Sequence, residues 1–411
     1  MPQKTKIILI VTIIFVLGIL IGVYFYLSSK NTTTTDSNPS LLQKFNPFGT
    51  SAKNTTNTNK NTGTGDTGTS GITKANSRFY QITNFAIAGA AFLEDMRSLP
   101  VSNDATAPTS ELAPSIRYVE RSTGHIYQMY LDTKKSGTIS NSTIPGVYEA
   151  IFNNRATSTI YRYVSTDDKT ITSFLASLGG DSSFLPVDIT AISLSPNKTQ
   201  FFSIIKNVNG VTGTTNSFDE TKTTQVFTSA FSEWLPQWVT DKNIYLTTKP
   251  SYLAPGGVYI LNITNGTLSK IFGGIDGLTT LADNDGGFIL YNASLNIGPK
   301  LNVFDVKNHT SVDLGVYGLP EKCTWSTDNI DVYCALPNTI TGTEYPDYWY
   351  QGLVSFTDYF VKINTKTKNI TTIANSQDEV PVDATNLFLN KGEDKLFFTN
   401  KKDSTLWSLD L

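Results

Sequence analysis

Short β-prone runs separated by polar turns recur with a nearly constant spacing, and this repeat limits the fold more than any other feature of the sequence. In one form of the repeat, a polar turn leads into an apolar strand. Copies start about 42–44 residues apart, with a longer last interval, at Ser195, Val239, Asp283, Trp325 and Asn390. A period of roughly 40–50 residues with four strands per unit is typical of a β-propeller. We therefore predict an all-β fold of this type.

A second form of the repeat alternates aromatic and apolar residues and ends in a polar turn. We expect each copy to be the hairpin between the two outer strands of one blade. Six copies are visible, at 126–134, 160–168, 258–266, 301–309, 358–366 and 406–411. A seventh fits the more divergent stretch 210–230, where Thr223 begins a β-prone run. The count predicts seven blades, with six or eight as alternatives.

The two ends of the repeat region are expected to pair. The chain stops at Leu411, one strand short of a complete four-stranded blade, and the β-prone run 79–83 stands near the start of the region. If this run supplies the missing outer strand, it removes the open seam between the first and last blades. We therefore place the propeller domain at 77–411.

The region before the propeller has two parts. Residues 7–27 carry no charge and are rich in Ile, Val and Leu, over about the 20 residues that a membrane-spanning helix needs. Lys4 and Lys6 precede them, which predicts a cytoplasmic tail at 1–6 and export of everything after Leu27. The alternative is a cleaved signal peptide, but its apolar region would be shorter and would end at small residues. Residues 28–76 are dominated by Asn, Thr, Ser and Gly, which predicts a disordered linker.

The chain resembles a known group of propellers in several turns. The runs Leu194-Ser-Pro-Asn-Lys and Cys323-Thr-Trp-Ser-Thr-Asp, with the closing 395–411, are similar to degenerate WD-like repeats of the TolB type, in which a strand ends in a Trp/Phe-Ser-Pro-Asp-Gly-Lys turn. The similarity covers most of 77–411, although Trp, Pro and Gly are rarely kept together. With its apolar N-terminal segment, the chain resembles membrane-anchored propeller proteins of small-genome bacteria. This resemblance implies a fold and not a function.

Cysteine and histidine usage limits the covalent and metal chemistry. Cys323 and Cys334 flank a polar turn, so their sulfurs are expected to lie close together across a hairpin. A disulfide fits an oxidising compartment, and a pair of buried free thiols is the alternative. A zinc site needs four ligands, and no further Cys or His pair accompanies these two. The run 283–287 is similar to part of a calcium loop but lacks the downstream carboxylate, so we expect a tight turn, with no metal and no cofactor.

Charge and motif content exclude several classes of protein. Only 16% of residues are charged and the net charge is −3, which disfavours a basic nucleic-acid-binding surface. The sequence has no Gly-x-Ser-x-Gly elbow, Walker loop or dinucleotide fingerprint. His125 and His309 are the only histidines, and both stand in predicted turns. No catalytic residue is therefore assigned.

The candidate binding residues are aromatic. An insertion at 339–357 lengthens one blade by roughly 15–20 residues and holds Tyr345, Tyr348, Trp349 and Tyr350. Tyr and Trp dominate binding hot spots, so these side chains are candidates for contact with a protein or a glycan; the alternative is that they fold back over the blade or the channel. Trp234 is a further candidate.

The sequence thus predicts a single-pass protein of the plasma membrane with a periplasmic or extracellular propeller that binds or scaffolds a partner through loops of one face. One alternative is a carbohydrate-active hydrolase or lyase with carboxylates at the channel. Another is a structural spacer in an assembly of the cell envelope.

Overall fold

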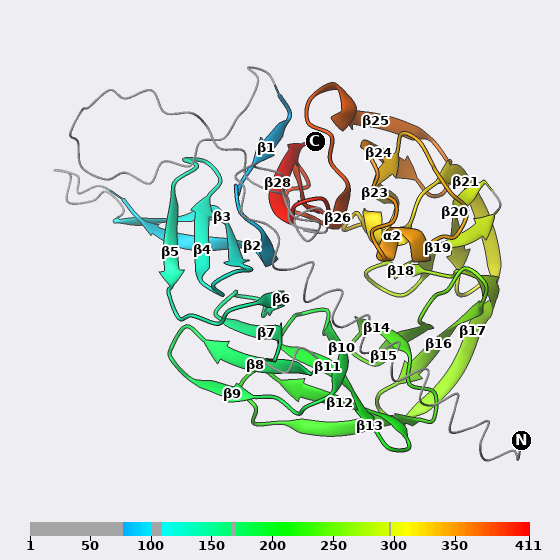
Figure 1. The fold of residues 1–411 in the computed structure, drawn as a ribbon, viewed down its shortest axis with the longest axis horizontal. Helices are drawn as coiled ribbons and strands as arrows, with labels where there is room; N and C mark the ends of the chain where they lie inside the picture. The colour runs from blue at the N-terminus through cyan, green and yellow to red at the C-terminus, as the bar shows by residue number, and fades with distance from the viewer. Residues whose placement is uncertain (1–76, 100–108, 166–169, 296) are drawn as a thin grey trace, which may run out of the picture. The chain divides into compact units, whose positions relative to one another are not determined.

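Seven antiparallel sheets of four strands each make up the described part of the chain (Figure 1). The computed structural model describes residues 77–99, 109–165, 170–295 and 297–411. The sheets follow one another around a common centre as the blades of a propeller. The prediction of an all-β, seven-bladed propeller is therefore confirmed.

The first three blades are each built from four strands that are consecutive in the chain. Within each blade the first strand is the inner one and the fourth is the outer one. The three blades contain, in order, β2 (Ile87–Ser98), β3 (Ser110–Glu120), β4 (Ile126–Tyr130) and β5 (Ser136–Ser140); β6 (Val147–Phe152), β7 (Ser158–Val164), β8 (Ile171–Ser177) and β9 (Ser182–Phe184); β10 (Ile189–Leu194), β11 (Gln200–Asn207), β12 (Gly210–Ser217) and β13 (Thr223–Ser229).

Blades 4 to 6 repeat this plan. They contain β14 (Trp234–Thr240), β15 (Asn243–Thr248), β16 (Pro255–Asn262) and β17 (Thr267–Asp276); β18 (Thr280–Ala282), β19 (Phe288–Leu295), β20 (Gly298–Asp305) and β21 (Thr310–Tyr317); β22 (Cys323–Trp325), β23 (Asp331–Pro337), β24 (Asp358–Asn364) and β25 (Ile370–Asn375). Short helices lie in three connections: η2 (Pro320–Lys322), α2 (Asp347–Tyr350) and η3 (Ser376–Asp378).

Blade 7 joins the two ends of the propeller. Its first three strands are β26 (Ala384–Leu389), β27 (Lys395–Asn400) and β28 (Thr405–Asp410), and its outer strand is β1 (Phe79–Gln81). β1 runs antiparallel to β28, with Phe79 opposite Leu409 and Gln81 opposite Trp407. The predicted closure by the run 79–83 is therefore present, with the strand itself limited to three residues.

One hairpin differs from its predicted place. The prediction places the run 160–168 between two outer strands, but residues 160–164 belong to β7, the second strand of blade 2, which pairs with β8. The second and third strands of a blade both lie between neighbours and bury side chains on both faces, so their apolar patterns look alike. The turn that precedes β7 also lacks the Ser-Pro-Asn type of motif. It has a positive φ of 51° at Ala156, as the Ser195-Pro-Asn-Lys198 turn has at Lys198 with 53°, so the geometry is shared although the sequence motif is not.

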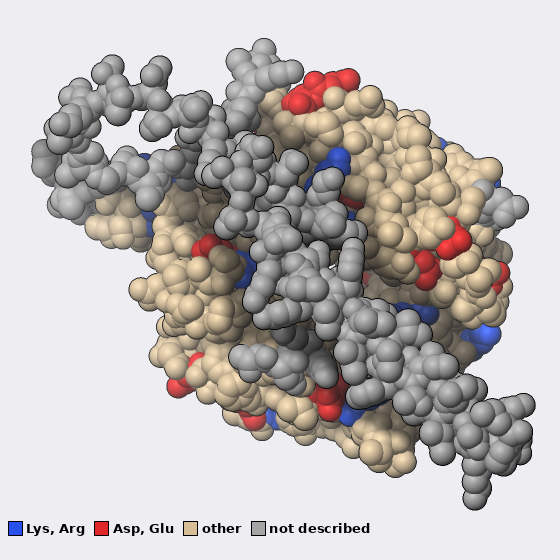
Figure 2. All heavy atoms as spheres, in the orientation of Figure 1, with Lys and Arg blue, Asp and Glu red and all other residues tan. Residues whose placement is uncertain are grey.

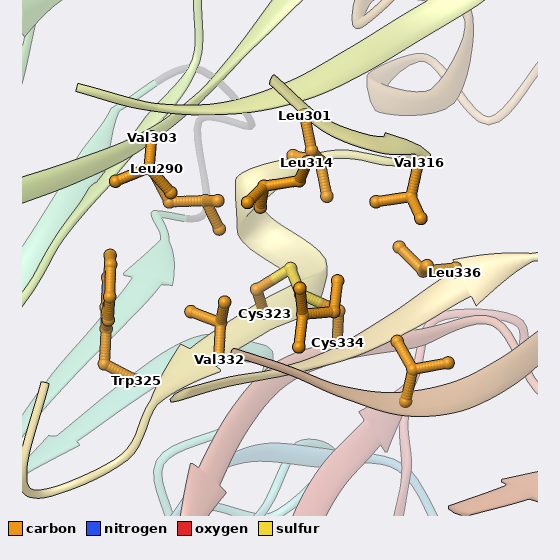
Figure 3. Close-up of a cluster of buried hydrophobic side chains, with 12 residues drawn as sticks. Leu290, Leu301, Val303, Leu314, Val316, Cys323, Trp325, Val332, Cys334 and Leu336 are labelled. Carbon is orange, nitrogen blue, oxygen red and sulfur yellow. A yellow bond between two sulfur atoms is a disulfide. The ribbon is translucent and has the colours of Figure 1, made fainter. Parts of the chain in front are cut away.

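The cores lie between adjacent blades, where the faces of two sheets meet. Between blades 5 and 6, Leu290, Leu301 and Val303 face Trp325 and Val332, and the disulfide lies in the same layer (Figure 3). Outer strands are much more exposed, and β5 has no buried residue. The alternation of apolar residues in the sequence therefore corresponds to the inner and middle strands of the blades and not to the outer strands.

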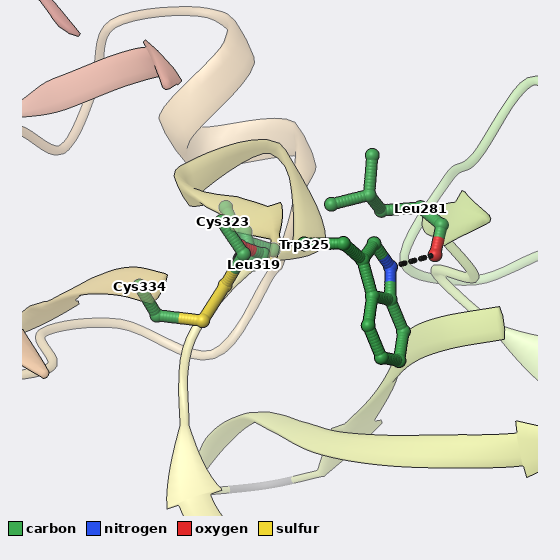
Figure 4. The surroundings of a disulfide bond; sticks show 5 residues. All are labelled: Leu281, Leu319, Cys323, Trp325 and Cys334. Carbon is green, nitrogen blue, oxygen red and sulfur yellow. Dashed lines mark hydrogen bonds between the residues drawn. A yellow bond between two sulfur atoms is a disulfide. The ribbon is translucent and has the colours of Figure 1, made fainter. Parts of the chain in front are cut away.

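A disulfide joins Cys323 and Cys334 within this core. The two residues lie directly opposite each other on β22 and β23, and their side chains are almost completely buried. Trp325, two residues farther along β22, donates a hydrogen bond from Nε1 to the Leu281 carbonyl of blade 5 at 3.2 Å (Figure 4). The disulfide thus links the two strands of the first hairpin of blade 6, and the hydrogen bond of Trp325 connects the same hairpin to blade 5.

We expect the double substitution Cys323→Ala and Cys334→Ala to lower the free energy of unfolding by about 2–3 kcal/mol, because it removes a cross-link that restricts the unfolded chain. Urea unfolding of wild type and variant without reductant measures the difference. The same comparison after reduction in denaturant is the control, since the two proteins should then differ by less than about 1 kcal/mol. An equally large difference after reduction would assign the loss to packing instead.

The predicted tail at 1–6, membrane span at 7–27 and linker at 28–76 lie outside the described residues. Within the described ranges, no helix has both the length and the apolar character needed to cross a membrane.

Candidate functional site

The inserted loop, residues 339–357, lies on one face of the propeller. It connects β23 to β24, the second and third strands of blade 6. In an antiparallel meander, successive connections emerge at alternate ends of the strands. This face, called here the insertion face, therefore also carries the second-to-third connections of the other blades and the connections between blades. η2 and η3 lie in two of these interblade connections.

Buried aromatic side chains fix the inserted loop to the propeller. Tyr345 is fully buried and Trp349 and Phe356 nearly so, and the three pack with Leu319. The rings of Tyr345 and Phe356 stack with centroids 5.8 Å apart. Tyr345 also accepts a hydrogen bond at its carbonyl from Ser294 Oγ of blade 5, at 2.6 Å. Two of the predicted binding residues, Tyr345 and Trp349, thus fold back onto the blade.

A buried ionic cluster lies directly beneath this aromatic layer. The cluster comprises Lys322 of η2, Asp358 at the start of β24, and Asp383 just before β26, and all three side chains are fully buried. Lys322 Nζ lies 2.8 Å from Asp358 Oδ2 and 2.6 Å from Asp383 Oδ1, and it donates to the carbonyl of Ala384 at 2.8 Å. One lysine therefore joins blade 6 to blade 7.

Asp383 connects the ionic cluster to the inserted loop. Its Oδ2 accepts hydrogen bonds from Trp349 Nε1 at 3.0 Å, from the Phe356 backbone N–H at 3.0 Å and from Ser355 Oγ at 3.2 Å. Lys322 Nζ also lies 5.3 Å from the centre of the Trp349 ring. The position of Trp349 is thus set both by packing and by a charge-assisted hydrogen bond.

The ionic cluster carries one more negative than positive charge when both carboxylates are ionised. Burial, opposed by Lys322 and assisted by Asp383, raises the pKa of Asp358 to about 6. Asp358 Oδ2 accepts from the Ala384 N–H at 2.7 Å, whereas its buried Oδ1 has no hydrogen-bond partner among the described residues. Among the described residues, Lys322 is the one cation that pairs with both carboxylates, so the balance of charge in the cluster depends on Lys322.

The outer surface of the inserted loop displays the other predicted tyrosines. Tyr350 is 42% exposed, and its hydroxyl donates to Glu321, whose other oxygen accepts from Thr279 at 2.9 Å. Tyr348 is partly exposed, and a hydrogen bond to Glu344 raises its pKa. Asp347 accepts from the Tyr252 backbone N–H of blade 4 at 2.6 Å.

The inserted loop therefore contacts blades 4, 5 and 7 as well as its own blade. We name Tyr348, Tyr350, Tyr252, Glu321 and Glu344 together the tyrosine surface, because the loop holds these partly or largely exposed side chains on one side of the insertion face.

Trp234, the fifth predicted binding residue, lies elsewhere. It begins β14 and is only 6% exposed, in the core between blades 3 and 4. Its Nε1 donates to the Phe231 carbonyl at 2.9 Å, and its ring meets Phe231 edge to face. Of the five predicted side chains, Tyr348 and Tyr350 are those that a partner could reach.

A cavity of about 420 Å³ opens at the centre of the propeller, between the inner strands of blades 7, 1 and 2. We call it the channel cavity. Its charged lining residues are Arg121, Lys401 and Glu149. Lys401 also lies 5.0 Å from the centre of the Trp349 ring, so this cavity adjoins the inserted loop.

The run 283–287 forms the turn between β18 and β19, as expected from its Asp and Gly content. Asp283 accepts hydrogen bonds from the backbone N–H groups of Gly286 and Phe288, at 2.6 and 3.0 Å. Burial and the neighbouring Asp285 raise the pKa of Asp283 to about 7. In the part of the chain that the structure describes, no group of three or more His, Cys, Asp or Glu side chains is arranged to hold a metal ion.

The comparisons with known proteins identify the fold. No protein-family model matches the chain, and no curated protein matches its sequence. Among solved structures, an oligogalacturonate lyase in complex with manganese is similar over 80% of this chain and 98% of its own, at 10% identity and a TM-score of 0.51. The chain resembles this structure in fold.

TolB from Acinetobacter baumannii is also similar, at 13% identity and a TM-score of 0.42, over 61% of this chain. The match covers 60% of the TolB chain. An oligogalacturonate lyase from Vibrio parahaemolyticus, at 9% identity and a TM-score of 0.47, covers 79% of this chain and 98% of its own. Sequence identities this low do not show a shared function, so the function has to be argued from the residues of this chain.

The ionic cluster could not be found from the sequence. In the sequence, Asp358 looks no different from Glu233 and Asp347, which are also acidic residues near aromatic ones. The structure separates these three, since Glu233 pairs with Lys249 at the surface and Asp347 contacts blade 4. Lys322 and Asp383 gave no signal, because their burial depends on contacts between segments about 60 residues apart.

Proposed function

We propose that this chain is an exported binding module, anchored through residues 7–27, that recruits a protein partner through the insertion face. The observation that carries the proposal is the fixed inserted loop, which buries Tyr345 and Trp349 while it displays Tyr348 and Tyr350. A site bound to a rigid scaffold loses little conformational entropy when a partner binds. Loops of this kind carry function more often than the strands that support them.

The chemistry of the tyrosine surface favours a partner with basic side chains. Tyrosine rings offer apolar area and a hydroxyl group, and the neighbouring Glu344 offers negative charge, whereas burial raises the pKa of Glu321. Figure 2 shows that the visible propeller surface is mostly uncharged, with acidic and basic side chains scattered in small groups. The partner is therefore expected to place lysine or arginine next to this surface.

The test is crosslinking in intact cells, followed by affinity recovery of the full-length protein. The informative variant replaces Tyr348 and Tyr350 with Ser. The matched control is Leu268→Ser at the start of β17, an exposed apolar residue on the opposite face. We expect one protein to be recovered with wild type and control and to be lost with the double variant. Equal recovery from all three proteins would overturn the proposal and favour a spacer role.

A carbohydrate-active lyase or hydrolase is the second candidate. The channel cavity supports it, because its volume is that of a small-molecule site and it contains the carboxylate of Glu149. One solved structure of similar fold is named an oligogalacturonate lyase, so oligogalacturonate is the first substrate to try. New chain ends formed by wild type but not by Glu149→Gln would support this candidate. Their absence with wild type would count against it.

A further inference from the structure

Small residues on two inner strands line part of the channel cavity. Ala88, Gly89 and Ala90 of β2 and Ala150 of β6 line it. At Gly89 the two strands approach so closely that a Cβ atom would lie 2.0 Å from the carbonyl oxygen of Ala150. Backbone and short side chains therefore form this part of the wall, and longer polar side chains enter from the neighbouring loops.

Two cations of this cavity differ from the other half-buried or buried cations of the propeller. Among the described residues, Lys322, Arg162 and Arg117 each form an ion pair with a carboxylate. None of the ion pairs within the described ranges includes Arg121 or Lys401. The cavity therefore holds positive charge that the protein itself does not neutralise by direct contact.

Both cations are associated with one turn. Arg121 follows β3, and its Nη1 lies 3.4 Å from Ser404 Oγ. Ser404 and Lys401 belong to the turn between β27 and β28, which is closed by a hydrogen bond from the Ser404 N–H to the Asn400 carbonyl at 2.7 Å. Burial, opposed by the charge of Asp383, lowers the pKa of Lys401.

The remaining polar lining is neutral or already paired. Glu149 is the one acidic residue among the described lining residues, and its Oε2 is bound by Arg162 Nη1 at 2.6 Å. Asn386 lines the wall in a left-handed conformation, with a φ of 53°, where the pairing of β26 with β27 is interrupted. Together with Ser404 and Thr399, it adds uncharged hydrogen-bonding groups to the two cations.

We propose that the channel cavity binds a small oxyanion, a carboxylate or phosphate group, between Arg121 and Lys401. The unpaired cations supply the charge, and the neutral side chains accommodate the polar remainder of the ligand. A volume of about 420 Å³ suits a metabolite of the size of a sugar acid or sugar phosphate. This site is separate from the tyrosine surface. The proposal of anion binding can therefore be correct or wrong whether or not the tyrosine surface binds a protein.

Isothermal titration calorimetry of the full-length protein tests the site, with D-glucuronate, inorganic phosphate and the uncharged D-glucose as probes. We expect binding of at least one anion, weakened by added NaCl, and no binding of glucose. A preference for glucuronate over phosphate would identify a carboxylate ligand, and the reverse preference a phosphate ligand. Absence of heat with both anions, or equal binding of glucose, would overturn the proposal.

The residues are tested with Lys401→Met and, separately, Arg121→Gln. Each should weaken anion binding by about tenfold or more, because a charge-assisted contact is lost. Lys402→Met is the matched control: Lys402 is exposed and contacts Thr357 and the Pro381 carbonyl outside the cavity lining. Unchanged thermal unfolding of the variants rules out loss of the fold. Anion binding at wild-type strength in both cavity variants would refute the assigned site.

Discussion

Replacing Lys322 with Met should lower the free energy of unfolding by about 3–5 kcal/mol at pH 8, as expected when one partner of a buried ion pair is removed. The variant would leave Asp358 and Asp383 fully buried without the cation that contacts both of them. Trp349 would keep its hydrogen bond to Asp383, so the inserted loop should retain its place in molecules that fold. Urea unfolding followed by tryptophan fluorescence measures the loss.

The loss of stability caused by Lys322→Met should depend on pH. Asp358 has a pKa of about 6 in the folded protein, above the ordinary value of 3.8, so the folded state binds its proton more tightly than the unfolded state does. Its contribution to stability is therefore present at pH 4 and is lost as the pH rises through 6. Removal of Lys322 takes away the cation that opposes this shift, so the pKa of Asp358 should rise further, and protonation of Asp358 at pH 5 should recover part of the loss.

Lys249→Met is the control for this experiment. Lys249 pairs with Glu233 at 2.9 Å, but its side chain is 64% exposed, so its replacement should cost less than about 1 kcal/mol. An equally small cost for Lys322→Met at pH 8, or the same cost at pH 5 and pH 8, would contradict the role assigned to the ionic cluster.

Phe79→Ala is expected to have a similarly large effect, about 3–5 kcal/mol, although it alters a strand of only three residues. Phe79 is 2% exposed and packs edge to face against Phe360 of blade 6 and Phe398 of blade 7, with centroids 5.4 and 6.4 Å apart. Its removal leaves a cavity in the core between these blades and weakens the pairing of β1 with β28.

Urea unfolding gives the overall loss for Phe79→Ala, and amide hydrogen exchange locates it. Exchange should accelerate first along β28, which β1 covers. Phe184→Ala is the control, because that ring is 69% exposed at the end of β9 and its loss should cost less than about 1 kcal/mol. A small loss for Phe79→Ala, or faster exchange spread evenly over all blades, would argue against a closure that depends on this residue.

The fold could be predicted well from the sequence because each blade repeats a local pattern. The spacing of the turns that begin at Ser195, Val239, Asp283, Trp325 and Asn390 corresponds to the connection between the first and second strands of successive blades. The closing strand at 79–83 followed from the incomplete last blade. Blade 2 was misassigned in part, since its strands lack a distinguishing turn and look alike when both faces are buried.

The site was much less predictable. The aromatic content of the inserted loop predicts a binding site there, but periodicity cannot say which of four neighbouring rings points inward. Tyr345 and Trp349 are buried because they meet Leu319 and Asp383, which belong to other segments of the chain. Arg121 and Lys401 line the same cavity but belong to blades 1 and 7, 280 residues apart in the sequence, so no local pattern could have linked them.

The way in which blade 7 is completed also determines how the propeller responds to mechanical force. A pull transmitted along the chain from residues before Ser77 enters the domain through β1, whose three residues are held by pairing with β28 and by the ring of Phe79. The other outer strands each follow directly from the third strand of their own blade. Tension applied from the N-terminal side therefore acts first on the pairing of β1 with β28, which joins the two ends of the propeller. Blade 7 would yield there before the disulfide-linked blade 6 bears the load.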